Sequence, residues 1–369
     1  MIGIWIWMGC ASPQDEQIFE YTGTHIDMFE KVMRLTQRED LYQDGVWKEH
    51  FGDGCLFGPS FDIQYGLATD SDLHMERGHT TLDHNAGFVE EASQELLSYN
   101  DQLEFLSMSL LSLSRVGPLA GENYVQSIDP LLQSLDTISL AVGDYFEITV
   151  GEFATTSYGP TSVSNFLTIN HIERAAGYEE NSEHHFDRAR AMMTAIHDVA
   201  WDEELATYRF AREDTRRMLY PNITFMLSYA RMYQETGEEE FLEAFYRTYD
   251  GIEPLRAASG DHFHSPYSFE SMGATDEDYS TLSSQNYLML ALLSAYQSTG
   301  DKALLDEVDT ILTFIETHLM DGDLITHHWI DGRAANHEDP WFFCMGCNLQ
   351  TLYILVVREL IRMEEQNEP

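Results

Sequence analysis

One stretch decides the fold of this chain, YLMLALLSAYQSTGDKALLDEVDTILTFI, which spans residues 287–315. In it an apolar helical pattern ends at Gly300, and a second apolar helical pattern follows. The same layout occurs twice upstream, with turns at Gly177 and Gly237. The turns lie 237 − 177 = 60 and 300 − 237 = 63 residues apart. Such a repeat predicts stacked helical hairpins, because one hairpin cannot bury its own apolar face.

Each second helix of the repeat is followed by a short segment in which polar and aromatic residues alternate. These segments span 207–212, 261–267 and 323–333. They fall at the same phase of the repeat, so we expect them to project at the same end of the stack. The alternation predicts short hairpins or extended loops there.

The rest of the chain carries weaker patterns. Apolar stripes predict a first helix at 17–36 and a last helix from about 348 to 363. Residues 44–84 are rich in Gly, His and aromatic residues, which favours irregular structure with short strands. Together the patterns predict a single all-α domain over 17–369, built from about five to six helical hairpins.

Two phrases at the turns carry a family resemblance. They are ARMYQETG at 230–237 and AYQSTGD at 295–301, with Asp321-Gly-Asp323 before the last strand-like piece. They resemble the six-hairpin (α/α) toroid enzymes, which include glycoside hydrolases, polysaccharide lyases and the N-acylglucosamine 2-epimerase type of sugar isomerase. The resemblance implies an (α/α) toroid with short strand-like loops at one end. It matches no single family's catalytic motif, so it assigns no catalytic residue.

The charge of the chain limits its partners. The chain has 63 acidic and 20 basic residues, which gives a formal net charge of −43. Such a surface repels phosphate backbones and anionic lipid headgroups, so no nucleic-acid partner is expected. The acid excess has two interpretations, adaptation to a salty environment or simple solubility.

The chain begins with an apolar run, MIGIWIWMGCAS at 1–12. It resembles the end of a bacterial lipoprotein signal, which implies lipidation of Cys10 and export to the cell envelope or the extracellular space. Residues 1–16 would then be a truncated signal and linker; the alternative is a disordered apolar tag. No other apolar run is long enough to span a bilayer, so membrane contact is expected through the lipid anchor only.

Two of the remaining cysteines, Cys344 and Cys347, form a CxxC motif. Outside the cytosol they could form a disulfide, and they could equally be small buried apolar residues. Together with His337 they could hold zinc, which resembles the metal site of lanthionine-forming cyclases, although the cysteine–histidine order of those enzymes is absent. A lone CxxC is a weak zinc signal. We therefore predict no metal and no cofactor.

In a closed ring of hairpins, loops from one end converge on a concave centre, which is a natural ligand site. Glycoside hydrolysis needs two carboxyl groups roughly 5–9.5 Å apart, and elimination or epimerisation needs one base and one acid. The predicted catalytic residues are His264, Tyr267, His327, Asp331, His337 and Glu338. The predicted substrate-binding residues are His84, Trp329, Arg333 and Trp341.

Each of these groups also has a purely structural interpretation. Adjacent histidines on a strand point to opposite faces, so only one of His327 and His328 would enter the centre. His262 and His264 could serve as acid and base or bind a metal, or could belong to a satisfied polar loop. The 337–341 segment suits sugar binding, and it also suits a helix-entry turn.

The sequence therefore favours an exported carbohydrate-active protein that cleaves a saccharide by acid/base chemistry. Hydrolysis is the first choice, and elimination or epimerisation is the second. The alternative is a non-catalytic lipoprotein whose helical-repeat scaffold binds a glycan or a partner protein, because fold alone does not separate the two classes.

Overall fold

The computed structural model describes residues 19–43, 46–47, 53–94, 201–209, 217–265, 279–339 and 342–367, with isolated residues between 186 and 200 and two short strands between 267 and 274. Only the backbone is described for residues 46, 53–56, 85–94 and 367 and for those two strands. Cys10, Trp341 and the turn at Gly177 lie outside the described residues.

The second and third predicted hairpins are confirmed. Helices α9 (Leu219–Thr236) and α10 (Glu239–Ile252) form one, and α11 (Leu282–Thr299) and α12 (Lys302–Phe314) form the other. Gly237 and Gly300 each end the first helix of their hairpin at φ +68°, a left-handed conformation that glycine adopts without a Cβ clash.

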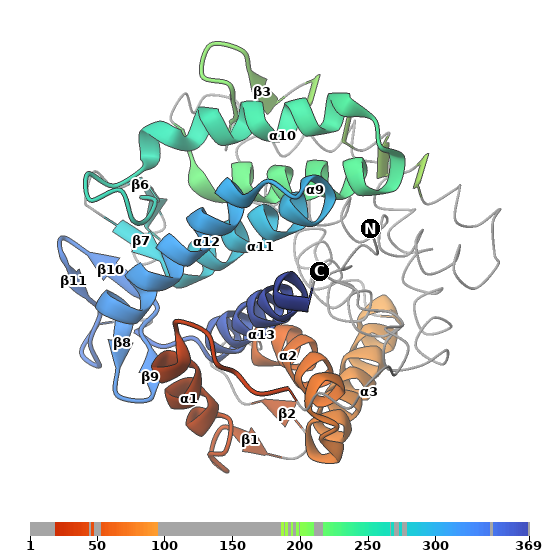
Figure 1. Ribbon diagram of the computed structural model, residues 1–369, viewed down its shortest axis with the longest axis vertical. Helices are drawn as coiled ribbons and strands as arrows, with labels where there is room; N and C mark the ends of the chain where they lie inside the picture. Colours follow the sequence, from red (N-terminus) through yellow and green to blue (C-terminus); the bar gives the residue numbers. More distant parts are fainter. Residues whose placement is uncertain are drawn as a thin grey trace.

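The helices form an inner and an outer layer (Figure 1). Inner helix α9 packs on α11, α11 packs on α13 (Met345–Asn367), and α13 packs on α2 (Asp53–Thr69). The outer helices are α10 on α9, α12 on α11 and α3 (Asp72–Gln94) on α2, while α1 (Ile26–Leu35) lies beside α13. The contact of α13 with α2 brings the last inner helix against the first. The fold is an (α/α) toroid.

Residues 44–84 are mostly helical, so the predicted irregular structure is wrong. After strands β1 (Tyr42–Gln43) and β2 (Val46–Trp47), this region forms α2 and the first part of α3. Its glycines are contact points: a Cβ on Gly58 would lie 2.3 Å from a Trp47 ring atom, and one on Gly78 would lie 2.5 Å from Ile63. They allow close packing of these elements, which a pattern of glycines as loop markers does not indicate.

Short antiparallel strands follow the outer helices, as the alternating segments predicted. After α10 come a 3-10 turn, Glu253–Leu255, and strands β5 (Tyr267–Ser268) and β6 (Gly273–Ala274). After α12 comes a π-helical turn, Ile315–Leu319. The other pairs are β3 (Trp201–Asp202) with β4 (Thr207–Tyr208), β8 (Met320–Asp321) with β9 (Leu324–Ile325), and the sheet β7 (Tyr279–Thr281), β10 (His328–Ile330) and β11 (Arg333–Ala334).

An amide side chain near the start of each of three inner helices holds one of these segments. Each amide bonds both the backbone N–H and the backbone C=O of one residue, and we call these contacts the amide clamps. Asn222 clamps Tyr208, Gln285 clamps Phe263 and Asn348 clamps Ile325. The clamp residues lie 285 − 222 = 63 and 348 − 285 = 63 residues apart. The clamps therefore follow the helical repeat.

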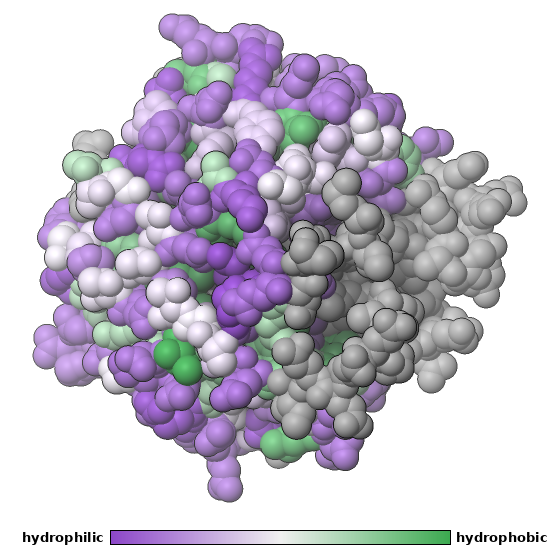
Figure 2. Space-filling model, in the orientation of Figure 1, coloured by the Kyte–Doolittle hydropathy of each residue, from purple (hydrophilic) through white to green (hydrophobic). Residues whose placement is uncertain are grey.

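The described surface is strongly polar. Figure 2 shows hydrophilic residues over most of the described part of one face, in keeping with the acid excess of the chain. Among the described helices, none combines the length and apolar composition that crossing a membrane requires.

The clamp at Asn348 gives a stability prediction. Its amide accepts from the Ile325 N–H (2.8 Å) and donates to the carbonyl oxygens of Ile325 (3.0 Å) and Cys344 (2.8 Å). Asn348→Ala removes the side-chain partner of the buried Ile325 N–H and C=O, while the Cys344 carbonyl oxygen keeps its bond from the backbone N–H of residue 348. Urea titration should therefore show the free energy of unfolding reduced by about 2–4 kcal/mol. Thr313→Ala, at an exposed position of α12, is the control and should change it by no more than about 0.5 kcal/mol. Equal effects of the two changes would contradict the clamp.

Candidate functional site

The loop end of the toroid is the end at which α9, α11 and α13 begin. Strand β10 pairs with β7, which leads directly into α11. Immediately before β10, Thr326 forms an antiparallel bridge with Phe343, which leads into α13. The 326–328 segment is thus held between the starts of two inner helices.

His327 is fixed at this junction through its backbone. Its N–H donates to the Phe342 carbonyl oxygen (2.7 Å), and its own carbonyl oxygen accepts from the Leu282 N–H (2.8 Å). These two backbone bonds, to the entries of two different helices, fix the position of the His327 Cα.

The two adjacent histidines meet rather than pointing apart. His327 Nδ1 lies 3.2 Å from His328 Nε2, and His328 Nδ1 lies 2.9 Å from the Tyr279 hydroxyl oxygen. The expectation of opposite faces is wrong because His327 occupies a bend ahead of β10 and does not follow the alternation of the strand. The result is a polar chain that runs from the buried Tyr279 and His328 to the half-buried His327.

Burial, and after it the neighbouring His328, lowers the pKa of His327 well below its ordinary value. The ring is therefore neutral at pH 7. A neutral imidazole whose Nδ1 lies against another ring presents Nε2 as a proton acceptor or as a ligand.

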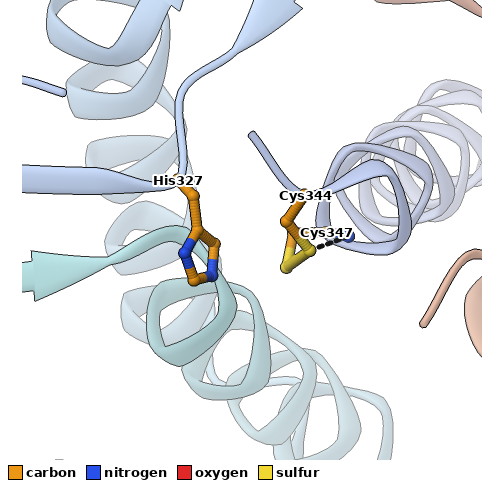
Figure 3. A group of neighbouring side chains, drawn as sticks. All are labelled: His327, Cys344 and Cys347. Carbon is orange, nitrogen blue, oxygen red and sulfur yellow. Dashed lines mark hydrogen bonds between the residues drawn. A yellow bond between two sulfur atoms is a disulfide. The ribbon is translucent and has the colours of Figure 1, made fainter. Parts of the chain in front are cut away.

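The ring of His327 lies against the CxxC motif (Figure 3). Cys344 and Cys347 form a disulfide in this structure. One nitrogen of His327 and the two sulfur atoms all lie within 4.8 Å of one another. The histidine beside the cysteines is thus His327 and not His337, because the Thr326–Phe343 bridge brings the strand entry to the helix entry.

His337 lies in the 331–339 loop together with two other predicted catalytic residues, Asp331 and Glu338, and all three are exposed. Arg333 closes this loop through a two-pronged ion pair with Asp339 (2.7 and 3.1 Å). That ion pair, helped by the Asn336 N–H, lowers the pKa of Asp339 to about 2. The predicted sugar-binding Arg333 therefore also has an internal partner that shapes the loop.

The other predicted binding residues are spread over the molecule. Trp329 packs against the outer-helix residue Phe314 (ring centroids 5.6 Å apart) and against His318 (5.1 Å). His84 is exposed on outer helix α3. Tyr267, which was predicted to be catalytic, lies in strand β5, of which only the backbone is described.

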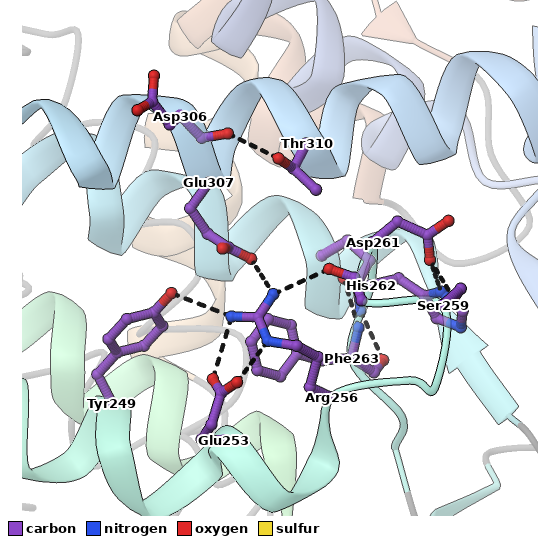
Figure 4. Close-up of polar contacts among 12 residues, drawn as sticks. Tyr249, Glu253, Arg256, Ser259, Asp261, His262, Phe263, Asp306, Glu307 and Thr310 are labelled. Carbon is purple, nitrogen blue, oxygen red and sulfur yellow. Dashed lines mark hydrogen bonds and ion pairs between the residues drawn. The ribbon is translucent and has the colours of Figure 1, made fainter.

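The 253–265 segment is built around Arg256 (Figure 4). Arg256 pairs with Glu253 and Glu307 (2.7 Å each), and its guanidinium group lies 4.4 Å from the ring centroid of Phe263. His262 stacks on Phe314 at 4.0 Å and bonds Asp261 through Nδ1 (2.8 Å).

His262 therefore belongs to a packed polar loop rather than to an open site. His264 is half-buried, and its N–H donates to the Leu255 carbonyl oxygen (2.8 Å). The next residue, Ser265, donates its N–H to the carbonyl oxygen of Tyr279 (2.7 Å), which ties this segment to β7.

Three inner-helix aromatic residues that the sequence patterns did not single out meet at Tyr287. Tyr287 of α11 lies 5.6 Å from Tyr220 of α9 and 6.2 Å from Phe57 of α2 (ring centroids). We call these three residues the aromatic floor. Tyr287 and Phe57 are buried, whereas Tyr220 is half-buried. Three helices far apart in the sequence thus place aromatic rings together.

Gln350 is a second residue that sequence reasoning missed. It lies on inner helix α13, is 1% exposed, and neither its Oε1 nor its Nε2 has a hydrogen-bond partner in the described part of the chain. Buried amides are normally paired, so this one calls for an explanation. The signal in the sequence was a glutamine within the most apolar part of the last helix.

Comparisons with known proteins show the fold. No family model and no curated protein matches the chain. Among solved structures, a family 76 α-mannanase of Bacteroides thetaiotaomicron aligns with a TM-score of 0.62 and 12% identity, covering 93% of this chain and 98% of that one. The family 76 α-1,6-mannanase of Salegentibacter sp. HEL1_6 aligns with 0.61 and 10%, covering 91% and 99%. The chain has the toroid fold of these enzymes.

Two further structures widen the comparison. An unsaturated glucuronyl hydrolase specific for heparin aligns with a TM-score of 0.59 and 11% identity, covering 92% of this chain and 97% of that one. An inactive variant of the Salegentibacter enzyme, with two aspartates changed to asparagine, is in complex with α-1,6-mannotriose. At such low identity the comparison transfers the fold and no individual residue.

The unpaired amide leads to a prediction about stability. Gln350→Met should leave the free energy of unfolding unchanged or raise it by about 1 kcal/mol, because a buried amide without partners is removed. Gln285→Met, at a clamped position, is the control and should lower it by about 2–4 kcal/mol. Parallel urea titrations test the pair. Equal losses would mean that Gln350 is held like Gln285.

Proposed function

We propose that this protein binds a saccharide at the loop end of the toroid and cleaves it by acid/base chemistry, with hydrolysis favoured over elimination or epimerisation. The proposal rests on one observation. The clamps and the β7–β10 pairing bring polar groups from distant parts of the chain to the starts of α11 and α13. This occurs on a fold shared with solved saccharide-cleaving enzymes.

The 331–339 loop supplies the carboxyl groups for this chemistry. Asp331 and Glu338 are exposed, and the Arg333–Asp339 ion pair holds the loop that carries them. One carboxyl group would protonate the leaving oxygen, and the other would act as base or nucleophile. His264 and His337 supply the imidazoles that elimination or epimerisation would use.

The inner helices supply groups suited to a sugar. Aromatic faces bind the apolar faces of sugar rings, and Tyr220 is the half-buried member of the aromatic floor. Sugar hydroxyl groups both donate and accept hydrogen bonds, so they would satisfy both atoms of the Gln350 amide.

Carboxyl-group variants assayed on a glycan panel test the proposal. Asp331→Asn or Glu338→Gln should lower kcat by at least about 100-fold, because one proton-transferring group is lost while the fold is kept. Asp323→Asn is the control, since that carboxylate is exposed and bonded to Arg34 (2.7 Å). It should keep wild-type kcat.

The same panel separates the alternatives. Gln350→Met should raise KM or weaken glycan binding while the protein remains as stable as wild type. Full activity in both carboxyl variants would refute the assignment of the loop. Binding of a glycan by the wild type with no cleavage of any panel member would support the alternative of a non-catalytic binding protein.

We also propose that the protein is exported and anchored through a lipid on Cys10. The lipoprotein-like start of the chain supports this, and the Cys344–Cys347 disulfide is compatible with an oxidising compartment. When expressed in a bacterial host, the wild type should partition into the detergent phase and Cys10→Ser into the aqueous phase. Identical partitioning of the two would refute the anchor.

A further inference from the structure

The cluster of His327, Cys344 and Cys347 contains none of the carboxyl groups proposed above for saccharide cleavage. Each residue offers one ligand atom, and these atoms all lie within 4.8 Å of one another (Figure 3). Two thiolates and an imidazole are the donor set that soft or borderline divalent metals, zinc above all, prefer.

The backbone that carries this cluster is held by many bonds. Asn348 clamps Ile325 and also donates to the Cys344 carbonyl oxygen (2.8 Å). Asn286 of α11 donates to the Cys347 carbonyl oxygen (2.9 Å). The three ligand positions are therefore placed by the fold and do not depend on the disulfide alone.

Both cysteines lie at the start of α13. The Cys344 carbonyl oxygen accepts the N–H of Asn348, so Cys344 occupies the N-cap position of the helix. The Cys347 N–H donates to Cys344 Sγ (3.0 Å). The first turn of the helix therefore carries both sulfur atoms.

The imidazole also has the support that metal-binding histidines usually have. Nδ1 of His327 lies 3.2 Å from His328, which in turn lies 2.9 Å from the Tyr279 hydroxyl oxygen. Metal ligands of this type are commonly oriented by a hydrogen bond on the other ring nitrogen. That arrangement leaves Nε2 of His327 for a ligand.

We propose that His327, Cys344 and Cys347 form a redox-gated site that binds one Zn²⁺ when the disulfide is reduced. In the oxidised protein the sulfur atoms are bonded to each other and the site is closed. In the reduced protein they separate, and each takes a Zn–S bond of about 2.3 Å. Water fills the remaining position. The proposal does not depend on saccharide cleavage.

The chemistry of the switch balances with a dithiol as the reductant. Thiol–disulfide exchange transfers two electrons and two protons to Cys344 and Cys347, and the reductant leaves as its own disulfide. Binding of Zn²⁺ then displaces the two thiol protons, while neutral His327 donates a nitrogen lone pair. No other oxidant or co-reactant is needed.

Metal titration of the purified full-length protein tests the site. After anaerobic reduction with a dithiol and removal of the dithiol and of metals, Co²⁺ should bind at one equivalent and give thiolate charge-transfer and tetrahedral ligand-field bands. Zn²⁺ should then displace the Co²⁺. The oxidised protein should show neither signal.

Variants identify the ligands. His327→Ala should weaken Zn²⁺ binding by at least about 100-fold, and Cys344→Ser or Cys347→Ser should abolish the charge-transfer band. Tyr279→Phe, which removes the outer hydrogen bond, should weaken binding by about 10-fold. His318→Ala, which removes an exposed histidine outside the cluster, should bind like the wild type.

Three results would overturn the proposal. They are the absence of saturable Co²⁺ binding by the reduced wild type, unchanged affinity in His327→Ala, and equal binding by the oxidised and reduced proteins. A far-ultraviolet circular dichroism spectrum equal to that of the wild type shows that a variant has folded. If Cys344→Ser does not fold, His327→Ala and Tyr279→Phe still decide the question, because neither touches the disulfide.

Discussion

The loop end of this protein depends on a hydrogen-bonding constraint of very short strands. Two- and three-residue strands leave backbone N–H and C=O groups that a larger sheet would satisfy, and an unpaired buried group costs about 1–3 kcal/mol. Asn222, Gln285 and Asn348 meet this need, because a side-chain amide offers the same acceptor and donor as a peptide group. Each clamp joins a residue of a strand or of an isolated β-bridge to an inner helix, so the connecting loops are held at the helix ends.

That constraint explains why polar side chains lie close together at the loop end of the toroid. Once the strands are fixed, the β7–β10 sheet and the Thr326–Phe343 bridge bring the His327 segment between α11 and α13. The N-termini of helices carry partial positive charge, which favours thiolates and other anions there. The chain has a net charge of −43, so the partial positive charge of these helix N-termini is opposite in sign to the net charge of the chain.

Gln285 and Gln350 are the same residue type in two different hydrogen-bonding environments. Both lie on inner helices and both are buried. Gln285 is held by Phe263 and Ser280, whereas Gln350 has no partner among the described residues. An amide that stabilises the fold and an amide without a hydrogen-bond partner are hard to distinguish by composition. Only the hydrogen bonds separate them, and unsatisfied polar groups are found preferentially at functional sites.

The sequence by itself determined the hairpins, because Gly237 and Gly300 end helices in a conformation that few other residues adopt. The sequence also placed the polar segments at one phase of the repeat. It contains the 63-residue spacing of the clamp residues as well, but their role became visible only in the structure. The prediction of irregular structure for residues 44–84 was wrong, because glycines such as Gly58 and Gly78 allow close packing there and do not end helices.

Tertiary structure alone decided which histidine meets the cysteines. His337 is 344 − 337 = 7 residues from Cys344, whereas His327 is 344 − 327 = 17 residues away, so chain proximity favoured the wrong one. A backbone bridge between 326 and 343 reverses that order. Contacts across a fold depend on pairing between elements, which neither spacing nor residue type records.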